Sequence, residues 1–288
     1  MDNRKITADL LRRYVLHLRE EERADSTIEK YVRDLEALGR HLAGRPVTKA
    51  ALIGWKEELA QRHAPATVNS MIAAVNGFLH FMGWRECAVK LLKIQKSLFC
   101  DERRELTRSE YARLVRAAEQ EGNLRLSMVL QTICATGIRV SELRFITVEA
   151  VRTGRAEIVN KGKRRTVFLP DKLRRLLQKY LRGQKKTAQP ADAKNPVFTT
   201  RTGKPLDRSN IWRDMKRLCE SAGVEPGKVF PHNLRHLFAR TYYTLEKDLS
   251  RLADILGHSS INTTRIYTVE SGSVHLRQME RMALVLTT

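Results

Sequence analysis

The sequence predicts a mainly α-helical protein with two domains and one small antiparallel sheet. Apolar residues recur at helical spacing along most of the chain, and a charged run without such periodicity interrupts them near residue 98. Only residues 155–170 combine the short β-branched runs and the glycine-containing turn of a hairpin. With 288 residues, 42% of them apolar, the chain is long enough for two cores. We therefore expect one domain over residues 1–98 and another over residues 99–288.

Four amphipathic helices are expected in the first domain. In the second of these helices an apolar stripe lies over residues 28–42, Ser26 and Glu29 have the spacing of a capping box, and Gly44 follows the stripe. The other three stripes each follow a threonine in the N-cap position, namely Thr7, Thr48 and Thr67. Each helix has one apolar face that must pack against the others, so the pattern predicts a small helical bundle.

The second domain is predicted to consist of helices around the hairpin. Thr107 and Glu110 have the spacing of another capping box, and residues 124–135 form a strongly apolar helix that Gly137 should end. This apolar helix is expected at the centre of the core. After the hairpin comes a polar stretch over residues 182–196. Further helices are then predicted over residues 208–222, 232–245 and 249–256, followed by a short helix that carries Tyr267.

The charge of the chain predicts a polyanionic partner. Lys and Arg outnumber Asp and Glu by 53 to 32, which gives a formal net charge of +21 at pH 7 and a pI near 10.2. Residues 1–100 hold 17 basic and 12 acidic side chains, so most of the excess lies in the second domain. Nucleic acid is the first expectation, and an acidic membrane surface is the alternative.

Several other classes of protein are disfavoured by the sequence. Cys87, Cys100, Cys134 and Cys219 are widely spaced, without the pairing of a zinc site or a disulfide framework. The first residues mix charges into an apolar pattern, unlike a signal peptide, and no run approaches the ~18 apolar residues of a membrane span. The expectation is a cytoplasmic protein without a membrane segment.

Six side chains of the second domain have the chemistry of phosphodiester cleavage: Arg139, Lys161, His232, Arg235, His258 and Tyr267. Cleavage without water needs arginines for the non-bridging oxygens, a proton donor for the leaving 5′ oxygen and an in-line nucleophile. The six side chains supply all three. Asp and Glu do not gather as for a magnesium site, so no metal or cofactor is expected. Attack by a tyrosine would keep the bond energy in a phosphotyrosine ester, without ATP.

Four segments carry a resemblance to a known family. ATGIRVSELR, VNKGKRRTVFLP, PHNLRH and LGHSSINTTRIYT resemble, in this order and spacing, the four signature boxes of the tyrosine recombinase (phage integrase) family. They are most similar to its Xer-like and transposon-integrase branches. Any one box is a weak signal. Four in order, behind a helical domain of suitable size, cover nearly the whole chain and are specific.

The resemblance implies a role for each of the six residues. Arg139 and Arg235 would clamp the scissile phosphate, and Lys161 in the hairpin turn would protonate the leaving 5′ oxygen. His232 would assist proton transfer at the nucleophile, Tyr267.

Three further positions match the family's boxes. His258 would hydrogen-bond the phosphate. Glu142 matches an acidic position three residues after the first arginine, where it would support that arginine. His236 matches the last histidine of the third box, and we assign it to structure.

The resemblance also implies an architecture and an assembly. A SAM-like core-binding domain and a catalytic domain would form a C-shaped clamp around double-stranded DNA. Four protomers would exchange strands between two sites with short inverted repeats, by way of a Holliday junction. The chain begins almost at once with the core-binding helices, so no arm-binding domain is expected, which favours a simple recombinase of a mobile element or an inversion switch. A tail helix would dock into a neighbouring subunit through Leu276, Met279, Met282, Ala283 and Leu286.

Two other functions stay open on the sequence. A type IB topoisomerase shares the catalytic set but relaxes supercoils as a monomer, and the separate N-terminal bundle and the apolar tail argue against it. A DNA-binding regulator without cleavage activity fits the charge and the helices equally well. Taken alone, Tyr267 is more typical of a packed tyrosine. Arg235 and His232 are typical of a helix face paired with carboxylates, although only Glu225 and Glu246 lie nearby in the sequence.

Overall fold

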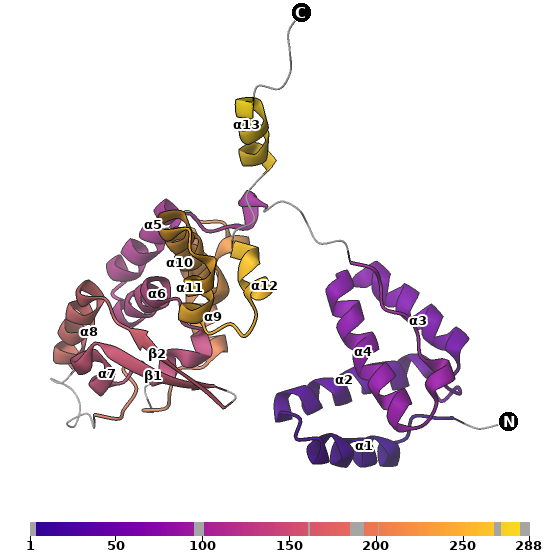
Figure 1. The fold of residues 1–288 in the computed structure, drawn as a ribbon. Helices are drawn as coiled ribbons and strands as arrows, with labels where there is room; N and C mark the ends of the chain where they lie inside the picture. Colours follow the sequence, from indigo (N-terminus) through magenta and orange to yellow (C-terminus); the bar gives the residue numbers. More distant parts are fainter. Residues whose placement is uncertain are drawn as a thin grey trace, which may run out of the picture. The chain divides into compact units, whose positions relative to one another are not determined.

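The computed structural model of the chain consists of two compact units (Figure 1). Unit 1 spans Met1–Lys96 and unit 2 spans Ser97–Thr288. The structure describes residues 4–94, 101–160, 162–184, 193–200, 202–267 and 272–282. Within these ranges the regular structure is helical apart from one two-stranded sheet, which confirms the predicted fold class. None of the helices in these ranges is long and apolar enough to cross a membrane.

Unit 1 is a bundle of four helices, α1 (Ala8–Glu20), α2 (Asp25–Leu42), α3 (Lys49–Arg62) and α4 (Pro65–Phe81). The apolar stripes that predicted these helices meet in one core. Its side chains without exposed surface include Leu35, Leu38, Leu52, Ile72 and Phe78. The expectation of a small helical bundle is therefore confirmed.

The predicted helix starts in unit 1 are right for two helices and wrong for the other two. The side chains of Thr7 and Thr48 accept hydrogen bonds from backbone N–H groups, as N-caps do. The capping box predicted at Ser26 does not form, because α2 begins at Asp25 and Ser26 lies inside its first turn. Similarly, α4 begins at Pro65, whose fixed φ and missing N–H suit a first helical turn, so Thr67 lies inside the helix.

Unit 2 packs around α6 (Leu124–Thr136), which contacts α5 (Arg108–Gln120), α8 (Asp171–Gln184) and α10 (Pro231–Glu246). The predicted central helix is confirmed, because Val129, Leu130 and Ile133 have no exposed surface. Further α-helices are α7 (Val148–Thr153), α9 (Arg208–Ser221), α11 (Leu249–Leu256), α12 (Ile261–Thr264) and α13 (Gly272–Met282). The 3₁₀ turns are η1 (Arg85–Cys87) in unit 1 and η2 (Glu102–Arg104), η3 (Val140–Phe145), η4 (Pro226–Lys228) and η5 (Arg265–Tyr267) in unit 2.

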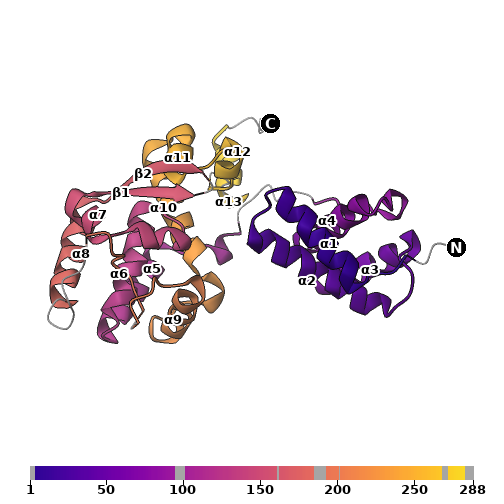
Figure 2. The same cartoon turned by 90° about the horizontal axis from the view of Figure 1, so that it is seen from below.

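The predicted hairpin consists of β1 (Arg155–Asn160) and β2 (Lys163–Phe168), paired antiparallel. Ile158 of β1 and Val167 of β2 are buried in the core of unit 2. The register pairs Arg165 with Ile158, so Arg165 lies on this inward face. Figure 2 shows the hairpin alongside α11, to which the Arg165 side chain is hydrogen-bonded.

Two helices of unit 2 are absent from the prediction. α7 is only six residues long and follows an N-cap at Thr147. α8 was missed because arginines and lysines dominate its sequence. Leu173 and Leu177, four residues apart, nevertheless give it one buried face. The polar stretch predicted from residue 182 therefore begins inside a helix.

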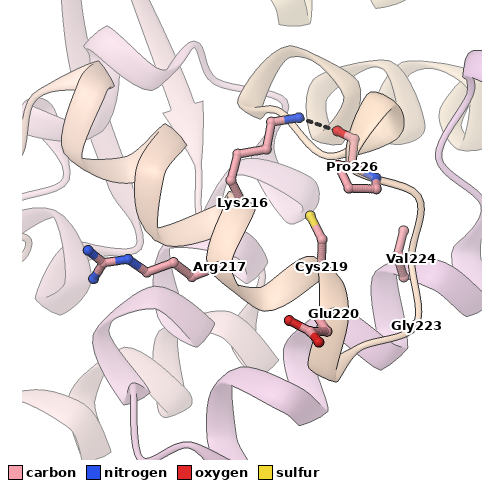
Figure 3. Close-up of a pocket in the computed structure, with 7 residues that line it drawn as sticks. All are labelled: Lys216, Arg217, Cys219, Glu220, Gly223, Val224 and Pro226. Atoms are coloured by element: carbon pink, nitrogen blue, oxygen red, sulfur yellow. Dashed lines mark hydrogen bonds between the residues drawn. The ribbon is translucent and has the colours of Figure 1, made fainter.

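A pocket lies beside the C-terminal half of α9 and the turn that leads to η4 (Figure 3). Lys216 reaches across its rim and donates a hydrogen bond to the carbonyl oxygen of Pro226, while Cys219 and Glu220 lie along its wall. None of the six side chains singled out by the sequence lines this pocket.

Candidate active site

Arg139 lies at the start of η3, two residues after Gly137 ends α6 in the left-handed region at φ +65°, as predicted. The Arg139 backbone N–H donates to Glu142 Oε2 at 2.8 Å, and its Nη1 donates to Glu142 Oε1 at 3.2 Å. The Glu142 side chain is 2% exposed, whereas the Arg139 side chain is 37% exposed. A buried carboxylate thus anchors an arginine that stays accessible.

A second arginine, Arg165 of β2, contacts the same carboxylate. Its Nη2 donates to Glu142 Oε2 at 2.6 Å, and its Nη1 donates to the carbonyl oxygen of Ile255. Burial lowers the pKa of Arg165, and the charge of Glu142 opposes this effect. Arg165 is not predictable from the sequence, because nothing in the run KGKRR sets one of its arginines apart.

Arg235 of α10 is 1% exposed and is held by the ends of two helices. Its Nη1 donates to the carbonyl oxygen of Gly137 at 2.5 Å, and its Nη2 donates to that of Leu256 at 2.8 Å. Carbonyls at helix C-termini lack partners within the helix and carry partial negative charge, so they suit a buried guanidinium. Burial and the charge of Arg139 lower the pKa of Arg235 to about 10, so it stays protonated at neutral pH.

His258 follows Gly257, which ends α11 at φ +66°. Its Nε2 lies 2.9 Å from Arg235 Nη2, and its Nδ1 lies 2.8 Å from Thr264 Oγ1. A guanidinium only donates, so Nε2 accepts and Nδ1 carries the proton that it donates to Thr264. Burial and the nearby Arg235 lower the pKa of His258 to about 4, so its ring is neutral at pH 7.

Tyr267 ends η5 and is 4% exposed. Its ring centroid lies 6.0 Å from that of His258, with the rings nearly parallel at 18°. The His236 ring lies 4.8 Å away at 90°. The electrostatic interaction with the Tyr267 side chain also acts to raise the pKa of Arg235. Tyr267 is therefore packed against two histidines beside the buried guanidinium.

His232 lies in the first turn of α10 and is exposed. Its ring centroid lies 4.7 Å from that of His236. Partial desolvation by the surrounding protein, followed by the charges of His236 and Arg235, lowers the pKa of His232 to about 4. His236, which we assigned to structure, contacts both His232 and Tyr267. A histidine assigned to packing thus touches the tyrosine itself.

The segment that leads into unit 2 is anchored to α10 next to these histidines. Asn233 Nδ2 donates to the carbonyl oxygen of Arg104 at 2.7 Å. Glu105 Oε1 lies 3.5 Å from His236 Nδ1, and its Oε2 lies 3.3 Å from Arg240 Nη1. The contact with His236 lowers the pKa of the Glu105 carboxyl group. The carboxylate that pairs with this helix face therefore comes from far away in the sequence.

The structure brings together five of the six predicted side chains, Arg139, His232, Arg235, His258 and Tyr267. Lys161 lies outside the described residues. The sequence analysis missed Arg165, Thr264 and Glu105. In the described ranges no three His, Cys, Asp or Glu side chains are grouped to hold a metal ion.

The cysteine side chains of the described residues are free thiols, at Cys87, Cys134 and Cys219. Cys100, the fourth cysteine, lies outside these residues. Burial raises the pKa of the Cys134 thiol to about 12, so this thiol is protonated at neutral pH.

Two family models match the chain. The phage integrase family matches residues 104–272, and the N-terminal SAM-like domain of phage integrases matches residues 11–86. The first match covers more than half of the chain and contains the whole cluster described above. The chain belongs to the phage integrase family. The resemblance found in its four boxes is thereby confirmed.

Relatives of this integrase include tyrosine recombinases named XerD. The protein of Xanthomonas campestris pv. campestris is 32% identical over 268 residues, covering 85% of this chain and 82% of that protein. The protein of Brucella suis biovar 1 is 32% identical over 274 residues, covering 85% of this chain and 87% of that protein. The integrase is accordingly a tyrosine site-specific recombinase.

Solved structures share its fold. The XerA recombinase is 25% identical with a TM-score of 0.52, covering 98% of this chain and 100% of that chain. A lambda integrase dimer bound to a COC′ core site is 18% identical with a TM-score of 0.72, covering 92% of this chain and 78% of that chain.

Proposed function

We propose that this recombinase cuts and rejoins the strands of double-stranded DNA through a covalent 3′-phosphotyrosine at Tyr267. The observation that carries the proposal is the packing of Tyr267 against His258 and beside Arg235. Attack would join Tyr267 Oη to phosphorus and break the bond to the 5′ oxygen. The new ester would conserve the bond energy, so the 5′ hydroxyl of the same or another strand can reverse the step without ATP.

Arg139 and Arg235 would bind the non-bridging oxygens of the scissile phosphate. Both are oriented before DNA arrives, Arg235 by two backbone carbonyls and Arg139 by Glu142. A guanidinium held in place stabilises the charge of a phosphoryl transition state without reorganising during the reaction. Arg139 is the more exposed of the two and would meet the phosphate first.

The neutral histidines would handle protons at the nucleophile. His232, with its pKa lowered to about 4, is unprotonated at pH 7 and can accept the Tyr267 proton. Both ring nitrogens of His258 are already hydrogen-bonded. A phosphate oxygen only accepts, so for Nε2 of His258 to bind it, Arg235 Nη2 must leave and Nε2 must gain a proton. Proton donation to the leaving 5′ oxygen is assigned to Lys161 on the family resemblance alone.

The assembly proposed is a homotetramer on two DNA sites with short inverted repeats, exchanging strands through a Holliday junction. Residues 1–98 would act as the core-binding domain and residues 99–288 as the catalytic domain, closing as a clamp around the duplex. The net charge of +21 supports backbone contacts with steep salt dependence. Leu276, Met279 and Met282 of α13 are all more than half exposed, which supports docking of this helix into a neighbouring subunit. Ala283 and Leu286 lie outside the described residues.

The experiment that tests the proposal uses nicked suicide duplexes that carry candidate sites from DNA flanking the gene, without metal or ATP. We expect a denaturation-resistant protein–DNA adduct that Tyr267→Phe abolishes. Tyr243→Phe is the matched control, because Tyr243 is a partly buried tyrosine of the same apolar cluster, and it should form the adduct at the normal rate.

Three outcomes would contradict the proposal in different ways. Binding without any adduct would favour a DNA-binding regulator. An adduct that persists in Tyr267→Phe would place the nucleophile elsewhere. Relaxation of supercoiled DNA by the monomer, without exchange between sites, would favour a type IB topoisomerase.

A further inference from the structure

Arg165 is a charged residue on the inward face of the hairpin, and the proposed chemistry gives it no role. Its register partner Ile158 is 1% exposed and Val167 on the same face is 5% exposed. The Arg165 side chain itself is 15% exposed. A guanidinium on an apolar face lowers stability unless its partners compensate for the lost hydration. The role of Arg165 can therefore be inferred from the groups that it contacts.

These partners lie on two other elements of unit 2. Arg165 joins β2 to Glu142 of η3 and to the carbonyl oxygen of Ile255 near the end of α11. Its side chain also passes directly over Gly257, where an added Cβ would lie 2.6 Å from Arg165 Cδ. The next residue is His258. One side chain thus connects the hairpin to the anchor of Arg139 and to the turn that carries His258.

The charges around Glu142 suggest a second effect of Arg165. Glu142 is almost fully buried and accepts hydrogen bonds from both Arg139 and Arg165. With Arg139 as its only partner, the carboxylate would neutralise the arginine that is proposed to meet the phosphate. With Arg165 as a second cation, the group of three keeps a net positive charge. Arg139 can then hold its geometry through Glu142 and still attract the phosphate.

We propose that Arg165 is a positioning residue for strand cleavage. It neutralises Glu142 so that the charge of Arg139 is available to the scissile phosphate, and it fixes β2 against the turn before His258. The inference rests on the proposed function, since it assumes that Arg139 binds that phosphate.

The test is a double-mutant cycle on the rate of adduct formation at saturating DNA. Arg165→Met should slow cleavage by about 10²-fold, the size of effect found when a group that stabilises transition-state charge is lost. Arg165→Met combined with Glu142→Gln should be faster than Arg165→Met alone, because no buried carboxylate then competes for Arg139. A double variant as slow as Arg165→Met, or slower, would overturn the inference, since a purely structural brace gives that result.

A substrate with an uncharged scissile linkage gives an independent readout. A methylphosphonate replaces one charged oxygen by a methyl group, so cleavage depends less on the charge of Arg139. The slowing caused by Arg165→Met should shrink on this substrate. Equal slowing on the phosphate and on the methylphosphonate would contradict a role through charge.

Arg152→Met is the matched control. Arg152 also pairs with a glutamate, Glu149, but its side chain is 77% exposed on α7, so cleavage should be unchanged. Thermal unfolding should show that each variant is folded. If Arg165→Met unfolds, Arg165→Gln replaces it in the same assays, because glutamine removes the charge but keeps an amide that can donate to Glu142 or to the carbonyl oxygen of Ile255. Absence of an adduct with the unaltered protein would contradict the proposed function, whereas normal cleavage by Arg165→Met contradicts only this inference.

Discussion

Unit 1 and unit 2 bury different kinds of side chain. Among the described residues of unit 1, the buried polar side chain is Asp34, which pairs with Lys30 one turn away. Unit 2 buries Glu142, Asn233 and Arg235, besides several hydroxyls. A buried charge lowers stability unless hydrogen-bonding partners are in place, and in unit 2 those partners come from several elements. Apolar packing is therefore enough to build a helical bundle. The proposed chemistry additionally requires a core in which charged side chains are buried together with their hydrogen-bonding partners.

Among the variants that compare the two units, Arg235→Met should have the largest effect. The variant removes a buried guanidinium that two helix C-termini hold, and adduct formation at saturating DNA should fall by about 10²- to 10³-fold. Its control lies in unit 1, where Arg45 likewise donates to two helix-end carbonyls, those of His41 and Leu42, but is exposed. Arg45→Met should cleave at the normal rate. An equal decrease of the adduct-formation rate in both variants would contradict the idea that only the buried arginine of unit 2 serves the chemistry.

The next largest effect is on stability and belongs to unit 1. Leu52 has no exposed surface, so Leu52→Ala should lower the free energy of unfolding by about 2–5 kcal/mol. The measurement is denaturant unfolding of the full chain, followed by the cleavage rate of the folded fraction at saturating DNA. That rate should be unchanged. A slower rate in the folded fraction would mean that the core of unit 1 supports the chemistry directly.

Each unit has a glycine in the left-handed region at which substitution by alanine adds one methyl group. Gly44 in unit 1 has φ +80° and open space around a Cβ, whereas a Cβ on Gly257 meets Arg165. Gly44→Ala should lower the free energy of unfolding by about 1–2 kcal/mol, the usual result of forcing an L-residue into this region. Gly257→Ala should lower it further and also slow cleavage. Identical stabilities and normal cleavage by both variants would show that the contact with Arg165 is easily relieved.

The smallest effect concerns pH. The lowered pKa values of His232 and His258, each about 4, mean that the unfolded chain binds protons at these positions between about pH 6.5 and pH 4 while the folded chain does not. Stability should therefore fall as the pH falls through this window, with little change above it. NMR of labelled histidines, with His258→Gln for assignment, should show no titration of His258 between pH 7 and pH 5.5. A midpoint near 6.5 would contradict a neutral, desolvated ring.

Much of the fold could be predicted because its signals are local. The apolar stripes, the cap at Thr107 and the stop at Gly137 all act within a few residues, and each is present as predicted. The errors are also local in origin. A proline in the first turn moved the start of α4, and charged residues hid the two leucines that bury α8.

The candidate site could be predicted only in part, because its partners come from distant segments. The nearby sequence offers Glu225 and Glu246 as carboxylate partners of His232 and Arg235, yet Glu105 is the carboxylate that contacts this helix. The carbonyl groups that hold Arg235 likewise follow from where α6 and α11 end in space. Motifs pointed to the candidate side chains, and only the fold reveals what surrounds them.

The anchoring of Arg104 and Glu105 to α10 bears on how hybrid recombinases should be built. A designer who grafts a foreign N-terminal domain onto this catalytic unit would naturally cut where helical periodicity fades. A junction placed after Glu105 would remove the segment that supplies one of the two acceptors of the Asn233 amide and the carboxylate partner of His236. A junction placed before Asp101 would keep both. The boundary at which a foreign domain can be joined is therefore set by the hydrogen bonds of α10, and if residues 1–98 contact DNA as proposed, new DNA specificity can be sought before this boundary without disturbing these contacts.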